Sequence, residues 1–146
     1  MAGAVRVEGL QELSLKLRAL GETVAARNLK GAARDAMQPT EQVAHATAPV
    51  GSRIHKTYKG RVVTPGFSQR SIRRTAFAKR GAKNEVRAVV GVSREAFYAL
   101  AFVERGTSKM PAQPWLVSAF EATQEQVLAR FKTSLVRRIE RAARKK

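Results

Sequence analysis

The residues with the clearest potential for chemistry are two histidines and a few acids. His45 lies four residues after Glu41, so the two side chains could share one face of a helix. A zinc protease needs a second histidine four residues from the first, and residues 40–49 contain no other histidine. His55 stands apart in a basic stretch. We therefore expect a surface contact between His45 and Glu41, and the pair does not predict a metal site.

Other catalytic signatures are missing from the sequence. It contains no Gly-rich phosphate loop of the Walker type and no dinucleotide-binding fingerprint. Its 11 acids are scattered and suggest no paired carboxylates for acid–base catalysis. The absence of cysteine excludes disulfides, thiolate zinc sites and cysteine nucleophiles. We expect a protein that is not an enzyme and that uses no cofactor.

Residues 97–121 differ in composition from the rest of the chain, which is built mainly from Ala, Val, Leu, Arg and Lys. Aromatic residues lead to the acid Glu104, and Gly106 then breaks the element. Prolines 111 and 114 fix their own backbone and bias the preceding residues toward an extended form. The sequence therefore predicts a stiff strap from Met110 to Trp115 that leads directly into a helix and is suited to docking.

This segment resembles the neck and tail-completion (head–tail joining) proteins of long-tailed bacteriophages, the gene-ten-like tail components. In that family a Tyr-Ala segment runs into Glu, then Gly-Thr-Ser and a basic residue, then Pro-Ala-x-Pro and an aromatic residue that opens the last helix. The matching positions are Tyr98, Ala99, Glu104, Gly106, Thr107, Ser108, Lys109, Pro111, Ala112, Pro114 and Trp115. A weaker match covers residues 5–13 and the Ala/Arg-rich helix that follows as far as Pro49. Over residues 51–70 the chain departs from the family, because a longer loop replaces a short Thr-Gly-x-Leu turn.

The resemblance implies a structural virion protein of the neck or upper tail, assembled in the host cytoplasm. Its partners would be copies of itself in a ring, expected to be a hexamer, neighbouring connector and tail proteins, and packaged double-stranded DNA, with no membrane. Subunits would be linked through the strap and through arms such as residues 5–7 or the 51–70 loop. The residues expected at the interface are Tyr98, Glu104, Gly106, Thr107, Lys109, Pro111, Pro114 and Trp115.

Two of these residues have alternative interpretations. Glu104 is either a surface acid near the end of an element or the partner of an arginine on a neighbouring subunit. Trp115 is either a core residue at the start of the last helix or an anchor in an interface, where tryptophan is enriched among the residues that dominate binding.

The charge of the chain is strongly positive and uneven. Lys and Arg number 28 against 11 acids, a formal net charge of +17, and no acid occurs between Gln42 and Asn84. Such a field attracts polyanions and makes copies of the chain repel one another. The residues expected to face DNA are Arg53, Lys56, Lys59, Arg61, Arg70, Arg73 and Arg74. Tyr58 and Phe67, which lie among these basic residues, could stack on single-stranded bases.

Two other interpretations of this charge remain open. In the first, these cations simply cover solvated surfaces. In the second, the chain binds nucleic acid through its charge. This binding would not be sequence-specific, because no helix-turn-helix, zinc finger or RNA-recognition signature is present.

The N-terminal half of the chain has the spacing of helices. Leucines recur at three- and four-residue intervals up to Leu20, and Gly21 should end this helix. A second helix from Glu22 must break or kink at Pro39, and helix is expected to resume over residues 40–47 with Thr40 as its cap. The preceding valines 5 and 7 are expected to form a strand or an arm.

The C-terminal half alternates between strand and helix patterns. Residues 72–78 and 85–92 predict an antiparallel hairpin with its turn at 79–84, whereas residues 97–104 fit either a strand or a short helix. A final helix is expected from Trp115 to Arg141, with residues 142–146 frayed. Its predicted buried stripe is Leu116, Phe120, Val127, Phe131, Leu135 and Ile139.

Together these patterns predict a single α+β domain over residues 1–146. A small antiparallel sheet of about three to four strands would pack against the long C-terminal helix, with N-terminal helices and a long, flexible basic loop at 51–70. No apolar run approaches the length of a membrane span, and the opening residues do not follow the plan of a signal peptide.

Overall fold

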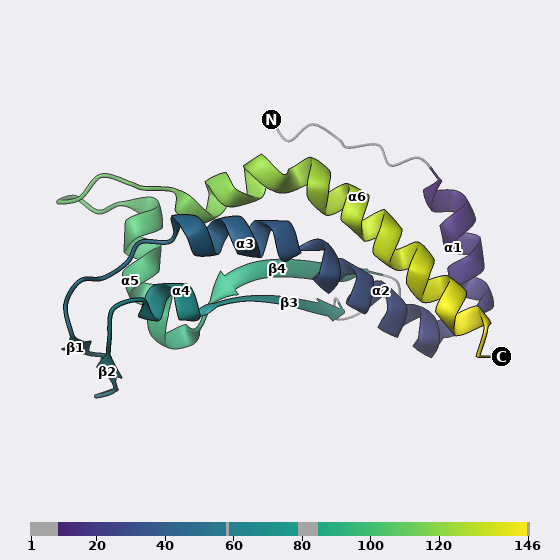
Figure 1. The fold of residues 1–146 in the computed structure, drawn as a ribbon, viewed down its shortest axis with the longest axis horizontal. Coiled ribbons are helices and arrows are strands. Elements are labelled where there is room, and N and C mark those ends of the chain that lie inside the picture. Colours follow the sequence, from purple (N-terminus) through teal and green to yellow (C-terminus); the bar gives the residue numbers. More distant parts are fainter. Residues whose placement is uncertain (1–8, 58, 79–84, 146) are drawn as a thin grey trace. The chain divides into compact units, whose positions relative to one another are not determined.

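The computed structural model describes residues 9–57, 59–78 and 85–145. It shows an α+β protein with a long C-terminal helix, as the sequence predicts (Figure 1). In chain order the elements are α1 (Leu10–Ala19), α2 (Glu22–Ala36), α3 (Gln38–Thr47), β1 (His55–Lys56), β2 (Val62–Val63), α4 (Phe67–Arg70), β3 (Ile72–Ala78), β4 (Val86–Val92), α5 (Arg94–Arg105) and α6 (Trp115–Ala143).

The chain forms two compact units. Unit 1 comprises residues 1–36, 76–88 and 125–146, and unit 2 comprises residues 37–75 and 89–124. Unit 1 therefore holds α1, α2 and the C-terminal part of α6, whereas unit 2 holds α3, α4, α5 and the N-terminal part of α6. The predicted helix boundary at Pro39 lies close to the division between the units.

Glycine and proline set the limits of the N-terminal helices. Gly21 has a φ of 86° and stands between α1 and α2, in the left-handed region that favours glycine. Pro39 occupies the first turn of α3, where a missing N–H costs no helical hydrogen bond. The prediction that Thr40 caps this helix was wrong, because Gln38 and Pro39 already belong to it. Thr40 is instead buried, with its hydroxyl oxygen 2.7 Å from Thr123 Oγ1.

The strands form two separate two-stranded sheets and not one larger sheet. β1 and β2 pair antiparallel, with His55 opposite Val63 and Lys56 opposite Val62, and α4 follows them within the 51–70 stretch. β3 and β4 form the predicted antiparallel hairpin. The predicted turn at 79–84 and the predicted arm at residues 5–7 lie outside the described residues.

The two alternatives for residues 97–104 are resolved in favour of a helix. α5 extends over Arg94–Arg105 and buries Ala96 and Leu100, which are four residues apart and so share one helical face.

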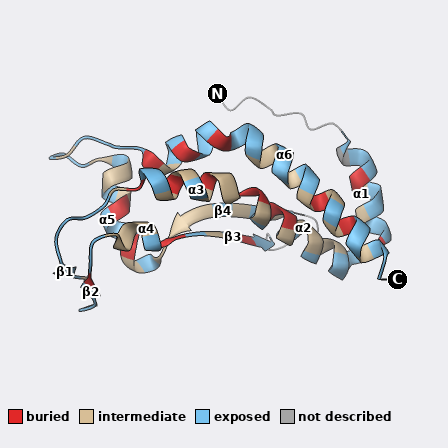
Figure 2. Cartoon of the chain, in the orientation of Figure 1, coloured by how far each residue is buried: buried red, intermediate tan, exposed pale blue. Residues whose placement is uncertain are grey.

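Each unit has its own apolar core (Figure 2). The core of unit 1 joins α1, α2 and α6 through Leu13, Leu20, Ala32, Leu135 and Ile139. The core of unit 2 consists of Ala44, Ala48, Ile72, Ala96, Leu100, Trp115 and Ala119. Alanine supplies four of those seven positions, which permits close approach of the helices that carry them.

The buried face of α6 differs from the prediction at its N-terminal end. Leu135 and Ile139 are buried as expected, but Phe120 is 43% exposed. The residues buried at this end are Trp115, Ala119 and Thr123, at a spacing of four. Only Trp115 among them is a large apolar residue, so a pattern drawn from large apolar side chains selects the wrong face. Within the described ranges, no helix is long and apolar enough to cross a membrane.

Candidate interaction surface

A tight backbone corner connects α5 to α6. Gly106 follows α5 with a φ of 74°, and its N–H donates to the Phe102 carbonyl at 2.8 Å. Thr107 and Met110 then pair as an isolated bridge, through N–H to carbonyl bonds of 2.8 and 3.2 Å. A Cβ on Gly106 would lie 2.7 Å from the Ala112 nitrogen and 2.9 Å from the Met110 carbonyl oxygen. Both the backbone angle and the close approach therefore require glycine here.

The Glu104 carboxylate satisfies the N-terminus of α6. Its two oxygens accept the backbone N–H groups of Leu116 and Val117, each at 2.9 Å. These N–H groups have no partner within the helix, and a negative charge is favourable at the positive end of the helix dipole. Neither sequence interpretation of Glu104 included this capping role, because the carboxylate comes from the preceding helix.

The second half of the strap from Met110 to Trp115 is tied to α5 by one hydrogen bond and to α6 by another. The Gln113 N–H donates to the Val103 carbonyl at 2.8 Å, and the Ser118 hydroxyl bonds to the Pro114 carbonyl. Trp115 is 7% exposed and belongs to the unit 2 core, so the core interpretation of this residue is the correct one. Its indole nitrogen is buried without a hydrogen-bond partner among the described residues.

The other residues expected at the interface divide by exposure. Tyr98, Thr107, Lys109, Pro111 and Pro114 are exposed, whereas Glu104 and Gly106 are half-buried. The exposed members can contact a partner. Glu104, Gly106 and Trp115 determine the shape of the corner that presents them.

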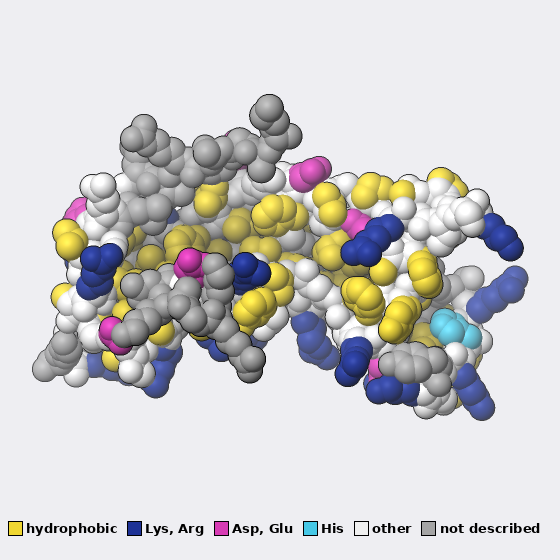
Figure 3. Space-filling model, turned by 180° about the vertical axis from the view of Figure 1, so that it is seen from behind, with side chains coloured by type: hydrophobic (Ala, Val, Ile, Leu, Met, Phe, Trp, Pro, Cys, Tyr) yellow, Lys and Arg dark blue, Asp and Glu magenta, His cyan; other side chains and the backbone are white. Residues whose placement is uncertain are grey.

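The outer side of α5 carries exposed aromatic residues. Phe97, Tyr98 and Phe102 are 49%, 60% and 54% exposed, and the Phe97 and Tyr98 rings meet edge to face with centroids 5.8 Å apart. We call these three residues the α5 aromatic face. Seen from behind, hydrophobic side chains lie at the surface of this part of unit 2, with Lys and Arg side chains nearby (Figure 3). The sequence analysis selected Tyr98 but missed Phe97 and Phe102. Had Ala96 and Leu100, four residues apart, been recognised as the buried face of a helix, Phe97 and Phe102 would have been placed on its exposed side.

Surface depressions border this face on two sides. One, of about 270 Å³, is lined by β4, α5 and the start of α6, and includes Phe97, Leu100 and Leu116. The other, also about 270 Å³, includes Tyr98 together with Arg53, His55, Lys56 and Phe67. The aromatic side chains therefore stand at the edges of two hollows and not on a flat surface.

The residues expected to face DNA are not equivalent. Arg74 pairs with Glu41 at 2.7 Å, and only 26% of its side chain is exposed. Its guanidinium is therefore directed to Glu41, whereas the sequence analysis expected it to face DNA. Arg61 pairs with Glu95 at 2.9 Å and lies 5.9 Å from the centre of the Phe67 ring.

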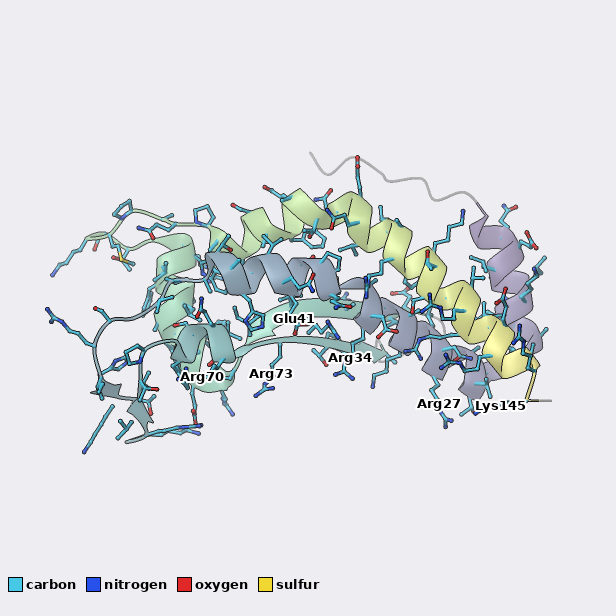
Figure 4. The ribbon with its side chains drawn as sticks, in the orientation of Figure 1. Arg27, Arg34, Glu41, Arg70, Arg73 and Lys145 are labelled. Carbon is cyan, nitrogen blue, oxygen red and sulfur yellow. The ribbon has the colours of Figure 1, made fainter. Side chains whose placement is uncertain are left out.

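The remaining DNA-facing candidates are exposed. Arg70 donates to the Pro65 carbonyl and to the Thr64 hydroxyl, which holds it against its own loop. Arg53, Lys56, Lys59 and Arg73 are exposed, and Figure 4 shows Arg70 and Arg73 on the outer side of α4 and β3. Tyr58 lies outside the described residues.

The predicted contact between His45 and Glu41 was wrong. Glu41 accepts both the backbone N–H and the guanidinium of Arg74, at 3.1 and 2.7 Å. Glu41 thus neutralises a basic residue brought to it by β3, which spacing along α3 could not reveal. Among the residues described, no group of three or more His, Cys, Asp or Glu side chains could hold a metal ion.

No protein-family model matches the chain, and comparisons with curated proteins and with solved structures find no significant similarity.

Proposed function

We propose that this chain is a structural virion protein of a tailed bacteriophage. It acts as a tail-completion or head–tail connector subunit, and several copies form a ring that joins the tail to the DNA-filled head. The observation that carries this proposal is the α5 aromatic face, presented beside a corner that the backbone fixes.

The energetics of this face favour a protein partner. The chain contains only six Phe, two Tyr and one Trp, yet three of these side chains are about half exposed on one helix. An aromatic side chain buries roughly 150–250 Å² when it is covered, and exposed apolar patches mark interaction sites. Aromatic residues are also enriched at the centres of protein interfaces.

The rigidity of the corner adds to this argument. The hydrogen bonds of Glu104, Gly106 and Gln113 are made within the chain. A partner that docks here therefore meets an ordered surface, and little conformational entropy is lost on binding. The residues that carry the resemblance to neck proteins are largely those that shape this corner, which supports a shared architecture at this site.

The charge of the chain is consistent with an assembly that contains an anion. At a net charge of +17, copies brought together in a ring repel one another unless negative charge is supplied. Packaged DNA or acidic neighbouring subunits would supply it.

A second candidate function is non-sequence-specific binding of nucleic acid by the isolated chain. The exposed cations Arg53, Lys56 and Arg73, which make no ion pair among the described residues, favour it. Binding of this kind weakens steeply as salt rises, so duplex DNA should be titrated at about 50 and about 200 mM salt. Tight binding by the monomer at the higher salt would favour this candidate over the connector.

The proposed function is tested by electron microscopy of particles from the encoding phage or prophage after deletion of the gene. DNA-filled heads beside separate tails of normal length would support a joining role. Overlong or missing tails would assign the protein to tail termination or tail assembly. Intact, infectious particles would contradict the proposal.

A further inference from the structure

A cationic pocket lies in unit 1, where α2 faces the C-terminal end of α6. Its volume is about 360 Å³. Four of its lining side chains are basic: Arg27, Arg138, Arg141 and Lys145. Leu20, Val24 and Ala142 supply an apolar part of the lining. Figure 4 shows Arg27 of α2 and Lys145, beyond α6, at the same end of this unit.

Among the described residues, Arg138 is the one cation of the pocket that has an acidic partner. Asp35 accepts its guanidinium at 2.7 and 3.2 Å and also accepts the Ser134 hydroxyl at 3.0 Å. In the part of the chain that the structure describes, Arg27, Arg141 and Lys145 make no ion pair. Like charges gathered at one site repel one another. An anion bound between them would remove this repulsion.

The helix dipole explains only some of these cations. Basic residues near the C-terminus of α6 are favoured by its negative end, which accounts for Arg141 and Lys145. Arg27 lies within α2, so that effect does not place it at the pocket. The adjacent Asn28 also lines the pocket, and its amide nitrogen is buried without a partner among the described residues. Two helices thus contribute hydrogen-bond donors and charge to one hollow.

We propose that this pocket binds a phosphate group. Guanidinium groups present planar pairs of N–H donors that match phosphate oxygens, and a phosphate has more acceptor oxygens than a carboxylate with which to join several cations. Arg27, Arg141 and Lys145 are exposed, so the phosphate of a nucleic-acid backbone can reach them as readily as a small phosphate can. This site does not depend on the proposed connector role, because its test uses the isolated protein.

The experiment compares two double variants of equal charge. Arg27→Gln/Arg141→Gln changes the pocket. Arg34→Gln/Arg137→Gln changes exposed arginines outside it, seven residues after Arg27 on α2 and four residues before Arg141 on α6. Fluorescence anisotropy with a duplex of about 20 base pairs, measured from about 50 to 200 mM salt, gives Kd and its salt dependence. Circular dichroism melting confirms that both variants fold.

We expect the pocket variant to raise Kd by about tenfold or more and to lower the slope of log K against log salt by about two. The control should change Kd by no more than about threefold, which corresponds to a weaker, diffuse charge effect. If the pocket variant melts earlier than the control, Arg27→Lys/Arg141→Lys keeps the charge and should still raise Kd, because the planar donors are lost.

A second arm identifies the source of the phosphate. Inorganic phosphate should raise the melting temperature of the wild type more than that of the pocket variant. If this difference appears while both variants bind duplex equally, the site serves a small phosphate and not nucleic acid. Equal effects of both double variants on duplex binding, with no difference in stabilisation by phosphate, would overturn the proposal.

Discussion

The two ends of α6 meet their electrostatic requirements in different ways. At the N-terminal end, in unit 2, an internal acid is present: Glu104 bonds the free N–H groups of Leu116 and Val117. At the C-terminal end, in unit 1, four basic side chains line one pocket, and among the described residues Arg138 is the one of these four that pairs with an acid, Asp35. The first end is complete within the chain, whereas the second has the composition of a site that requires an external anion.

This difference separates structural residues from functional ones. The residues that distinguish the 97–121 segment in the sequence mostly hold the corner together, and the α5 aromatic face beside them is left exposed. The sequence shows the basic residues only as an undifferentiated excess. The structure divides them into paired arginines, such as Arg61, Arg74 and Arg138, and three pocket cations that make no ion pair among the described residues.

The largest expected effect comes from the core residue at the N-terminal end of α6. Trp115→Ala should lower the free energy of unfolding by about 3–5 kcal/mol, because it leaves a cavity in the unit 2 core. Phe120→Ala, five residues later and 43% exposed, should cost less than about 1 kcal/mol. Urea unfolding measures both. Equal losses would show that Trp115 is not the anchor of this core.

The next effect tests the corner itself. Gly106→Ala should cost about 3 kcal/mol or more, since it combines a left-handed backbone with a collision against the backbone at Ala112. Gly21→Ala is the matched control: its φ is 86° but no atom lies within 4 Å of the added Cβ. It should cost only about 1–2 kcal/mol. If the two losses are the same in urea unfolding, the corner is not as tightly closed as described.

A smaller effect is expected from the acid that caps α6. Glu104→Ala removes two charge-assisted bonds to backbone N–H groups and should cost about 1–2 kcal/mol. Glu121→Ala, an exposed acid on the same helix, should change the free energy of unfolding by less than about 0.5 kcal/mol. If the Glu104 variant is as stable as the Glu121 variant in thermal and urea unfolding, Glu104 does not stabilise the N-terminal end of α6.

The smallest change in the free energy of unfolding is expected from Gly31→Ala, which disturbs an ion pair at the C-terminal half of α6. Gly31 lies directly under the Arg138 guanidinium, so Gly31→Ala must displace Arg138 from Asp35. Because this ion pair is about one-third exposed and alanine favours helix, the net change should stay within about 1 kcal/mol. A double-mutant cycle with Arg138→Gln measures the coupling. Strictly additive losses would show that the two residues do not interact.

The elements of this fold were largely predictable, because their signals are local. The leucine spacing before Gly21, the proline at 39 and the alternation in residues 72–78 and 86–92 each indicate an element through its own sequence. The division of the four strands into two sheets was not predictable, since β1 and β2 contain only two residues each.

The candidate sites depended on contacts between distant segments. Glu104 reaches Leu116 across the strap, Glu41 reaches Arg74 from another element, and Thr40 meets Thr123. Each partner is chosen by packing, so spacing along one element cannot identify it. The same holds for the cationic pocket, whose members Arg27 and Arg141 are far apart in the sequence.

The central claim is that the α5 aromatic face is an assembly surface of a head–tail connector. Its most direct test adds purified protein to a lysate from the gene deletion and counts infectious particles. The Tyr98→Gln/Phe102→Gln variant removes two rings from the face. The control variant, Leu15→Gln/Phe77→Gln, removes two exposed apolar side chains from unit 1.

Circular dichroism first shows that all three proteins are folded. The wild type and the unit 1 variant should then restore joining. The α5 variant should yield at least about tenfold fewer particles, since aromatic interface residues often contribute about 2 kcal/mol or more. Restoration by the α5 variant to the wild-type level would contradict the claim.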